Sequence, residues 1–494
     1  MSRVIVVGLD GATWDVLDPL MGRGVMPNLR RMAAAGARAP LASTLPSWTP
    51  PGWTSIATGL NPGNHGILYA AAVVPGEYPG AVIGGVPGRP ISALDVHGAP
   101  LWRAASAAGR RTCVLLVPLT YPPEPVNGTL VAGMFRPREA ADYVHPPAEA
   151  APPGGWRFDP ESVLRGGDAR HDDPAEVVGE LRAITEENAR AFEEELSREP
   201  WDLFFAVFMA PDRLSHYVWD RLADPDPSDP IDADVIGTFA AIDAFLGRAA
   251  EEPDATVVLV SDHGSGSGPV ERVNVIRALE EAGLWTPGWD RTSVFPVFSG
   301  DLHMVGVAAN EAGRWPRGSV PPDRAGETLD AAERALLAVR GEDGAAVVVR
   351  VHRHVYRGPF AASFPDRIAE LDPRYMATGV SGGPMFEPHR DPSTPWGGHR
   401  RDGILLLSGP GVAPGAAIRG TASVEDVAPT VMALLGLAFA DPVDGRVLEE
   451  LLVPGELLMA PRVPSSREGT AAAGVTPGEE AEIEGMLRGL GYVE

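Results

Sequence analysis

The sequence has 494 residues, of which 44% are hydrophobic and 22% charged, so it can bury a large core and form more than one domain. Its formal net charge of -25 argues against a general nucleic-acid binder and against attraction to an anionic membrane surface. Every basic residue is arginine, which excludes lysine chemistry, and the single cysteine, Cys113, excludes an intrachain disulfide and a cysteine-based metal site.

Short apolar runs and amphipathic segments alternate along the chain. Five runs are typical of buried parallel strands, at residues 4–7, 113–117, 203–208, 256–260 and 403–407. Helical patterns lie between or after them, at residues 27–35, 101–108, 175–196, 235–250 and 427–435. Strands that alternate with helices predict an α/β fold with a mainly parallel central sheet.

Some segments break this alternation and predict the domain organisation. Residues 264–396 separate two predicted strands by far more than a crossover helix requires, which predicts an inserted cap. We therefore expect a first core part at 1–263, with Gly- and Pro-rich excursions at 69–100 and 140–173, a cap at 264–396, a second core part at 397–460, and a linker with an amphipathic C-terminal helix at 461–494. No apolar run approaches the roughly 18 residues of a membrane span or resembles a signal-peptide core, so we expect a cytoplasmic protein without membrane contact.

Acidic and imidazole side chains follow or precede the predicted strands, where ligands bind in open α/β sheets. Taken singly, each fits a turn, a surface pair or a loop histidine. Together they offer only oxygen and nitrogen ligands, which suits zinc, with manganese as the alternative. Six ligands overfill one tetrahedral site, so we expect two divalent metal ions. The six are Asp10, Asp212, His216, Asp262, His263 and His399.

One hydroxyl-rich segment, residues 46–55, precedes a helix that we expect to begin near Gly52. Thr49 would then lie beside a helix N-terminus, whose unpaired N–H groups favour anions. The segment alone does not select Thr49, because four other hydroxyls compete with it for a role: Thr44, Ser47, Thr54 and Ser55.

These pieces, in this order, resemble the alkaline phosphatase superfamily, in its type I phosphodiesterase/nucleotide pyrophosphatase-like branch. The resemblance covers residues 4–10, 46–67, 212–216, 257–264, 396–410 and 424–448, and includes the family's T-G-x-x-P…H-G-I pattern at 58–62 and 65–67. It implies a three-layer sandwich around the sheet, with Thr49 as nucleophile and metal-bound residue. It further implies one metal on Asp10, Asp262 and His263, a second on Asp212, His216 and His399, and a structural role for His65.

The resemblance also implies an activity: a metal-dependent phosphohydrolase that cleaves phosphate mono- or diesters of a small molecule through a phospho-threonine intermediate. Gly52 stands where we align an asparagine that contacts the phosphoryl group in nucleotide pyrophosphatases, which weakens the case for a nucleotide diester. Further candidates for substrate contact are Arg213, Asn274, Arg400 and Arg401.

Other functions fit the same sequence. A phosphomutase, a phosphonate hydrolase or a sulfatase would share the fold, although threonine at position 49 argues against a sulfatase, which uses a modified cysteine or serine. The second alternative is a non-catalytic metal-binding scaffold. An unrelated Ser-His-Asp hydrolase is disfavoured because no G-x-S-x-G elbow is present.

Overall fold

The computed structural model describes residues 3–73, 76–78, 88–137, 140, 142–147, 156–157, 173–198, 200–389, 396–453, 461–463 and 474–489. Most of the predicted excursion at 140–173 lies outside the described residues. The same holds for part of the excursion at 69–100 and part of the predicted linker and helix at 461–494. In the described part, none of the helices combines the length and apolarity that a bilayer crossing requires.

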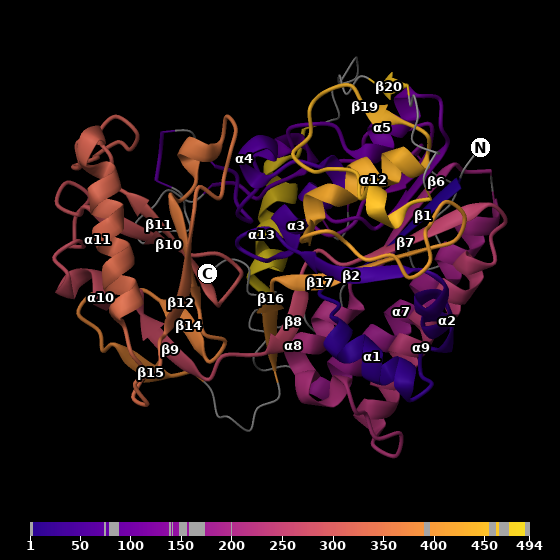
Figure 1. Ribbon diagram of the computed structural model, residues 1–494, viewed down its shortest axis with the longest axis horizontal. Helices are drawn as coiled ribbons and strands as arrows, with labels where there is room; N and C mark the ends of the chain where they lie inside the picture. Colours follow the sequence, from indigo (N-terminus) through magenta and orange to yellow (C-terminus); the bar gives the residue numbers. More distant parts are fainter. Residues whose placement is uncertain are drawn as a thin grey trace.

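A central sheet of nine described strands organises the larger lobe, in the order β18-β2-β17-β7-β1-β6-β3-β4-β5 (Figure 1). The strands β7, β1, β6, β3 and β4 run parallel to one another, whereas β17 is antiparallel to both β2 and β7, and β5 is antiparallel to β4. The sheet is therefore mainly parallel, as the sequence predicts. Its strands are β1 (Arg3–Leu9), β2 (Ala37–Ala42), β3 (Thr112–Leu115), β4 (Gly128–Val131), β5 (Val144–His145), β6 (Leu203–Phe208), β7 (Ala255–Val260), β17 (Asp402–Ser408) and β18 (Ala422–Ser423).

Helices cover both faces of this sheet and make a three-layer sandwich (Figure 1). In β1, Val4 and Val6 join one hydrophobic cluster while Ile5 and Val7 join another, because successive strand residues point to opposite faces. On the first face lie α3 (Thr49–Thr58), α5 (Leu101–Ala107), α12 (Val427–Leu434) and α13 (Pro477–Gly489). On the second lie α1 (Trp14–Gly22), α2 (Pro27–Ala35), α7 (Pro174–Arg198), α8 (Ala210–Leu222) and α9 (Pro230–Ala250).

A smaller lobe is formed by the segment inserted between β7 and β17 (Figure 1). It holds a four-stranded antiparallel sheet, β10-β11-β13-β12, a three-stranded sheet, β14-β9-β15, and a hydrophobic cluster of its own. Its elements are β9 (Glu271–Asn274), α10 (Val275–Glu281), β10 (Val294–Val297), β11 (Met304–Ala309), α11 (Ala325–Ala338), β12 (Val348–Arg353), β13 (Arg367–Leu371), β14 (Tyr375–Thr378) and β15 (Phe386–Pro388).

A two-stranded ribbon closes the base of this insertion. Its strands are β8 (Gly264–Ser267) and β16 (Gly397–Arg400), which pair antiparallel with His399 opposite Ser265. The ribbon packs against α8 and β17 of the core. The two flanks of the insertion therefore return to the same place beside the central sheet.

The predicted C-terminal helix is present as α13. Ile483, Met486 and Leu487 are buried against the core, while the Tyr121 hydroxyl donates to Glu479 Oε1 at 2.5 Å. The last residues of the sequence, 490–494, lie outside the described residues. Two smaller features complete the core: the helical turn α4 (Pro62–His65) and the pairing of β19 (Ala438–Phe439) with β20 (Arg462–Val463).

One buried carboxylate joins two helices of the second face. Asp243 of α9 accepts backbone hydrogen bonds from Asn28 (3.0 Å) and Leu29 (2.8 Å) at the beginning of α2. We expect Asp243→Ala to lower the free energy of unfolding by about 2 kcal/mol, because two N–H groups lose a charged acceptor. Urea unfolding measures this loss. A change below about 0.5 kcal/mol, the usual range for an unimportant surface position, would contradict it.

Candidate metal centre and nucleophile

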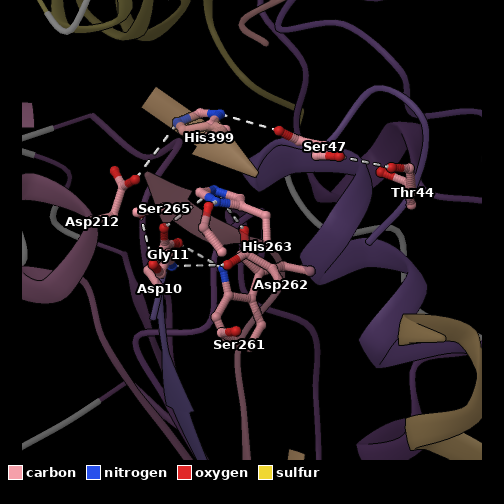
Figure 2. Close-up of polar contacts among 12 residues, drawn as sticks. Asp10, Gly11, Thr44, Ser47, Asp212, Ser261, Asp262, His263, Ser265 and His399 are labelled. Atoms are coloured by element: carbon pink, nitrogen blue, oxygen red, sulfur yellow. Dashed lines mark hydrogen bonds and ion pairs between the residues drawn. The ribbon is translucent and has the colours of Figure 1, made fainter. Parts of the chain in front are cut away.

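The predicted ligand residues meet at the carboxyl ends of three adjacent strands of the central sheet. Asp10 follows β1, Asp262 and His263 follow β7, and Asp212 and His216 lie on α8, which begins directly after β6. His399 reaches the same place from β16 (Figure 2). Parallel neighbours end at one edge of a sheet, so residues more than 250 positions apart become neighbours in space.

Each of the three histidines is held by a backbone carbonyl through Nδ1. The acceptors are the carbonyls of Gly397 for His216 (3.2 Å), Gly264 for His263 (3.0 Å) and Ser47 for His399 (3.1 Å). Since a carbonyl can only accept, each Nδ1 carries the hydrogen and each Nε2 offers a lone pair. This is the second contact that metal-binding histidines usually make.

Around Asp212, three ligand atoms form a first group. Asp212 Oδ1 lies 3.3 Å from His216 Nε2 and 3.5 Å from His399 Nε2, and the two Nε2 atoms are 3.3 Å apart. With both Nδ1 atoms protonated, the two facing nitrogens are both acceptors and cannot bond to each other. A cation between the three atoms satisfies all of them. Asp212 and His216 stand one helical turn apart on α8.

A second group joins Asp10, Asp212 and His263, whose ligand atoms all lie within 4.8 Å of one another. His263 Nε2 is 3.7 Å from Asp10 Oδ1 and 3.4 Å from Asp262 Oδ2. The family resemblance implies Asp10, Asp262 and His263 for this metal; Asp10 and His263 belong to the group, and Asp262 lies beside His263. Asp212 is the addition, since its carboxylate belongs to both groups.

Whether a metal ion fits between these ligand residues can be judged from the burial of their side-chain oxygen and nitrogen atoms. Asp10 Oδ1, Asp212 Oδ1, Asp262 Oδ2 and His263 Nε2 are buried and have no hydrogen-bond partner among the described residues. A buried polar atom without a partner is unfavourable, and here four of them converge. Oxygen and nitrogen donors in this number suit zinc or manganese. The residues present therefore fit a metal centre.

The charges of the site lead to the same conclusion. Burial raises the pKa of Asp10 well above its ordinary value, and the neighbouring Asp262 and Asp212 carboxylates raise it further. Burial also raises the pKa of Asp262, with the Asp212 charge adding to it. Burial alone would raise the pKa of Asp212 too, but His216, His399 and Arg213 bring it well below its ordinary value. Three carboxylates can ionise together in this dry space only when a cation compensates them.

Thr49 is the first residue of α3 and is fully buried. The helix thus begins three residues before the predicted start at Gly52, since Pro50 and Pro51 suit a first helical turn. The neighbours of Thr49 contact the site on both sides. The Ser47 carbonyl accepts from His399, and a Cβ added at Gly52 would lie 2.9 Å from Asp262 Cβ.

The four competing hydroxyls all have other partners. Thr44 Oγ1 donates to the Pro46 carbonyl and Ser47 Oγ to the Thr44 carbonyl (Figure 2), while Thr54 Oγ1 donates to the Pro50 carbonyl. Ser55 Oγ lies 3.0 Å from His65 Nε2. Thr49 itself lies between Ser47, whose carbonyl accepts from His399, and Gly52, which packs against Asp262.

His65 lies in the interior, away from the ligand groups. Its Nδ1 accepts from the Ile67 N–H at 3.1 Å, so its Nε2 donates to Ser55 Oγ. Burial lowers its pKa to about 3, which keeps the ring neutral. These contacts support the structural role that we expect for this histidine.

Two residues that sequence reasoning missed support the ligands. Trp53 Nε1 donates to Asp10 Oδ2 at 2.7 Å and leaves Oδ1 directed at His263. Gly11 has a φ of +64°, and a Cβ there would lie 2.8 Å from Asp212 Cβ, so glycine lets the β1 turn approach α8. The signal for Trp53 is its spacing, because it stands one helical turn after Thr49.

The candidates for substrate contact all make contacts within the protein. Arg213 is buried and donates to Asp212 Oδ2 at 2.9 Å, so it supports a ligand. Arg400 donates to the carbonyls of His399 and Ser267 within the ribbon. Asn274 caps α10, accepts from the Val380 N–H and donates to the Val380 carbonyl.

Arg401 and Gly52 complete this set of candidates. The Arg401 carbonyl accepts from the Ser43 N–H, which joins the beginning of β17 to the end of β2. Gly52 lies against Asp262, where the space for a larger side chain is missing. The Arg401 guanidinium has a buried Nε without a hydrogen-bond partner among the described residues, whereas the missing space beside Gly52 gives that glycine a structural reason.

Comparisons with known proteins identify the family and the fold of the chain. The model of a family described as type I phosphodiesterase/nucleotide pyrophosphatase matches residues 4–397. No curated protein matches the sequence. The solved structure of murine ectonucleotide pyrophosphatase/phosphodiesterase 5 is 15% identical, with a TM-score of 0.53 over 91% of this chain and 100% of that chain. Another structure of that protein, with the same identity and TM-score over 92% and 100%, is an inactive threonine-to-alanine variant in complex with AMP.

A third similar structure is a phosphonoacetate hydrolase from Sinorhizobium meliloti 1021, in complex with phosphonoformate. It is 18% identical, with a TM-score of 0.57 over 86% of this chain and 94% of that chain. At these identities the likeness shows the fold alone. It confirms the predicted α/β fold class.

The shared position of Asp212 predicts how metal binding responds to substitution. We expect His216→Ala to weaken one Zn²⁺ site and His263→Ala the other, each by more than about tenfold, a typical loss for residues around a metal. Asp212→Asn should weaken both sites. Titration of metal-free protein with Zn²⁺ measures this, with Asp243→Asn as a buried-carboxylate control that leaves both sites intact. Equal loss of both sites in all three variants would contradict two separate groups.

Proposed function

Because the chain belongs to the type I phosphodiesterase/nucleotide pyrophosphatase family, we propose that it is a two-metal phosphoester hydrolase with Thr49 as its nucleophile. The observation that carries the proposal is the convergence of four buried, unpartnered ligand atoms beside the segment that holds Thr49. A phosphorylated small molecule is the proposed substrate. Zn²⁺ is the proposed metal, with Mn²⁺ as the alternative.

Each of the two groups of ligands would hold one cation. His216, His399 and Asp212 would hold one, and Asp10, Asp262 and His263 the other, with Asp212 Oδ1 close to both. When bound, divalent cations supply Lewis-acid stabilisation of a phosphoryl group and lower the pKa of a nearby hydroxyl. The protein itself orients the ligand side chains: backbone carbonyls hold the histidine rings, and Trp53 holds the Asp10 carboxylate.

The proposed reaction has two displacements at phosphorus. Thr49 Oγ1 loses its proton and forms a bond to phosphorus while the bond to the leaving oxygen breaks, and that oxygen takes up a proton. Water then attacks the phospho-Thr49 ester, the bond between phosphorus and Oγ1 breaks, and Thr49 recovers its proton. Two in-line steps give net retention of configuration. A hydroxyl needs this activation because it is a weak nucleophile at neutral pH.

The similar structures support the nucleophile and the substrate class. The murine protein loses activity in a threonine-to-alanine variant and binds AMP, a phosphate ester. We assign the corresponding role to Thr49 because it is the threonine that lies at the beginning of α3, between the contacts to His399 and Asp262.

Removal of the Thr49 hydroxyl should stop turnover without emptying the site. We expect Thr49→Ala to lower kcat by at least about a thousandfold, because the covalent route disappears, and to retain both metal ions. Thr49→Ser keeps a hydroxyl and should retain measurable turnover. Steady-state kinetics with metal analysis checks both variants, and full activity in Thr49→Ala would eliminate the proposal.

A substrate panel separates the enzymes that share this fold. We expect the metal-loaded protein to cleave an aryl phosphate or an aryl phosphodiester at least about a hundredfold faster than an aryl sulfate. Phosphonoacetate belongs in the same panel, since a phosphonate hydrolase is one of the alternatives. Turnover of the sulfate or the phosphonate alone would replace the proposed activity. Bound metal ions with no turnover of any substrate would support the non-catalytic metal-binding scaffold.

A further inference from the structure

The inserted lobe contacts the core at the residues next to Thr49 and His399. The contact is made by residues 298–303, between β10 and β11, which we call the cap loop. A Cβ added at Gly300 would collide with the ring of Trp48, so the loop backbone lies directly on this tryptophan. A Cβ added at Gly398, beside His399, would lie 3.0 Å from His303 Nε2.

Asp301 makes the polar contact of this loop with the core. Its Oδ2 accepts from the Ser47 N–H at 3.0 Å, and its Oδ1 accepts from the His303 N–H at 2.9 Å. The side chain is buried, with 2% of the residue exposed. One carboxylate therefore ties the backbone of the cap loop to the backbone of the segment that leads into α3.

Ser47 connects this bond to the site. Its N–H is held by Asp301, and its carbonyl accepts from His399 Nδ1 at 3.1 Å (Figure 2). Ser47 also stands two residues before Thr49. A rotation of its peptide units would turn the His399 ring and displace the Thr49 hydroxyl together.

From this arrangement we propose that Asp301 is a positioning residue, which holds the Ser47 backbone so that Thr49 and His399 keep their relative placement. The inference rests on the proposed function, because it concerns the reaction of Thr49. Both oxygens are needed, since each accepts from a different N–H. An asparagine has the same shape but offers one oxygen, so it keeps one hydrogen bond and loses the other.

The test compares Asp301→Asn and Asp301→Ala with the wild-type protein, loaded with Zn²⁺, on the phosphoester that the panel identifies. We expect kcat to fall about tenfold in Asp301→Asn and up to about a hundredfold in Asp301→Ala, because small misplacement of a nucleophile has effects of that size. KM should stay within about threefold, and both metal ions should remain bound. Hydrogen exchange of the peptide that spans Ser47 should become faster.

Asp243→Asn is the matched control. Asp243 is also buried and also accepts from two backbone N–H groups, but these belong to α2, and no ligand residue is among its partners. It should lose stability like Asp301→Asn and keep the wild-type kcat. An Asp301→Asn kcat equal to that of Asp243→Asn would overturn the positioning role.

The outcome remains decisive when the proposed function itself fails. If the wild-type protein turns over none of the panel substrates, the proposed function is contradicted. The exchange measurement still detects the hydrogen bond from the Ser47 N–H to Asp301. Unchanged exchange at Ser47 in Asp301→Ala would then overturn the inference on its own. Faster exchange would support the hold of Asp301 on the Ser47 backbone, and the role in the reaction would then fail together with the proposed function.

Discussion

The site depends on three carboxylates, Asp10, Asp212 and Asp262, enclosed at one edge of the central sheet. Burial raises the pKa of Asp10 and Asp262, and repulsion between the carboxylates, which is weakly screened in this dry space, raises it further. Only part of the charge is balanced by the protein, through the contact of Arg213 with Asp212. Cations bound here would balance the remaining negative charge when the three carboxylates are ionised.

This constraint explains several features of the surrounding chain. Glycine at positions 11 and 52 lets the β1 turn and α3 approach α8 and Asp262 at distances that a side chain would prevent. Serine hydroxyls join the same segments, because Ser265 donates to the Gly11 carbonyl and Ser261 to the Ala12 carbonyl. Close packing and short hydrogen bonds thus fix the carboxylates before a cation arrives, which favours tight binding since little ordering is left for the binding step.

Sequence patterns predicted the parts of the fold that local chemistry determines. The apolar run at residues 203–208 coincides with β6, and the helical pattern at residues 27–35 coincides with α2. Both can be predicted because the spacing of apolar residues along a short stretch of sequence determines which positions are buried. The ribbon strand β8 was missed, since its Gly-Ser-Gly-Ser sequence has no strand propensity and it forms only against β16. Asp212 shows the same limit at the site. Its place in α8 follows from spacing, but its position between both ligand groups depends on how β1, β6 and β7 are ordered.

The place of the insertion gives the smaller lobe a mechanical role. It enters the chain between His263 and His399, so its two flanks carry ligands of different groups. The pairing of β8 with β16 holds these flanks side by side and places His399 opposite Ser265. This pairing separates the ligand residues from changes in the outer part of the lobe. The cap loop then returns to the core through Asp301 and meets the other side of the site at Ser47. A change at Asp301 would therefore reach the backbone beside Thr49, the proposed nucleophile.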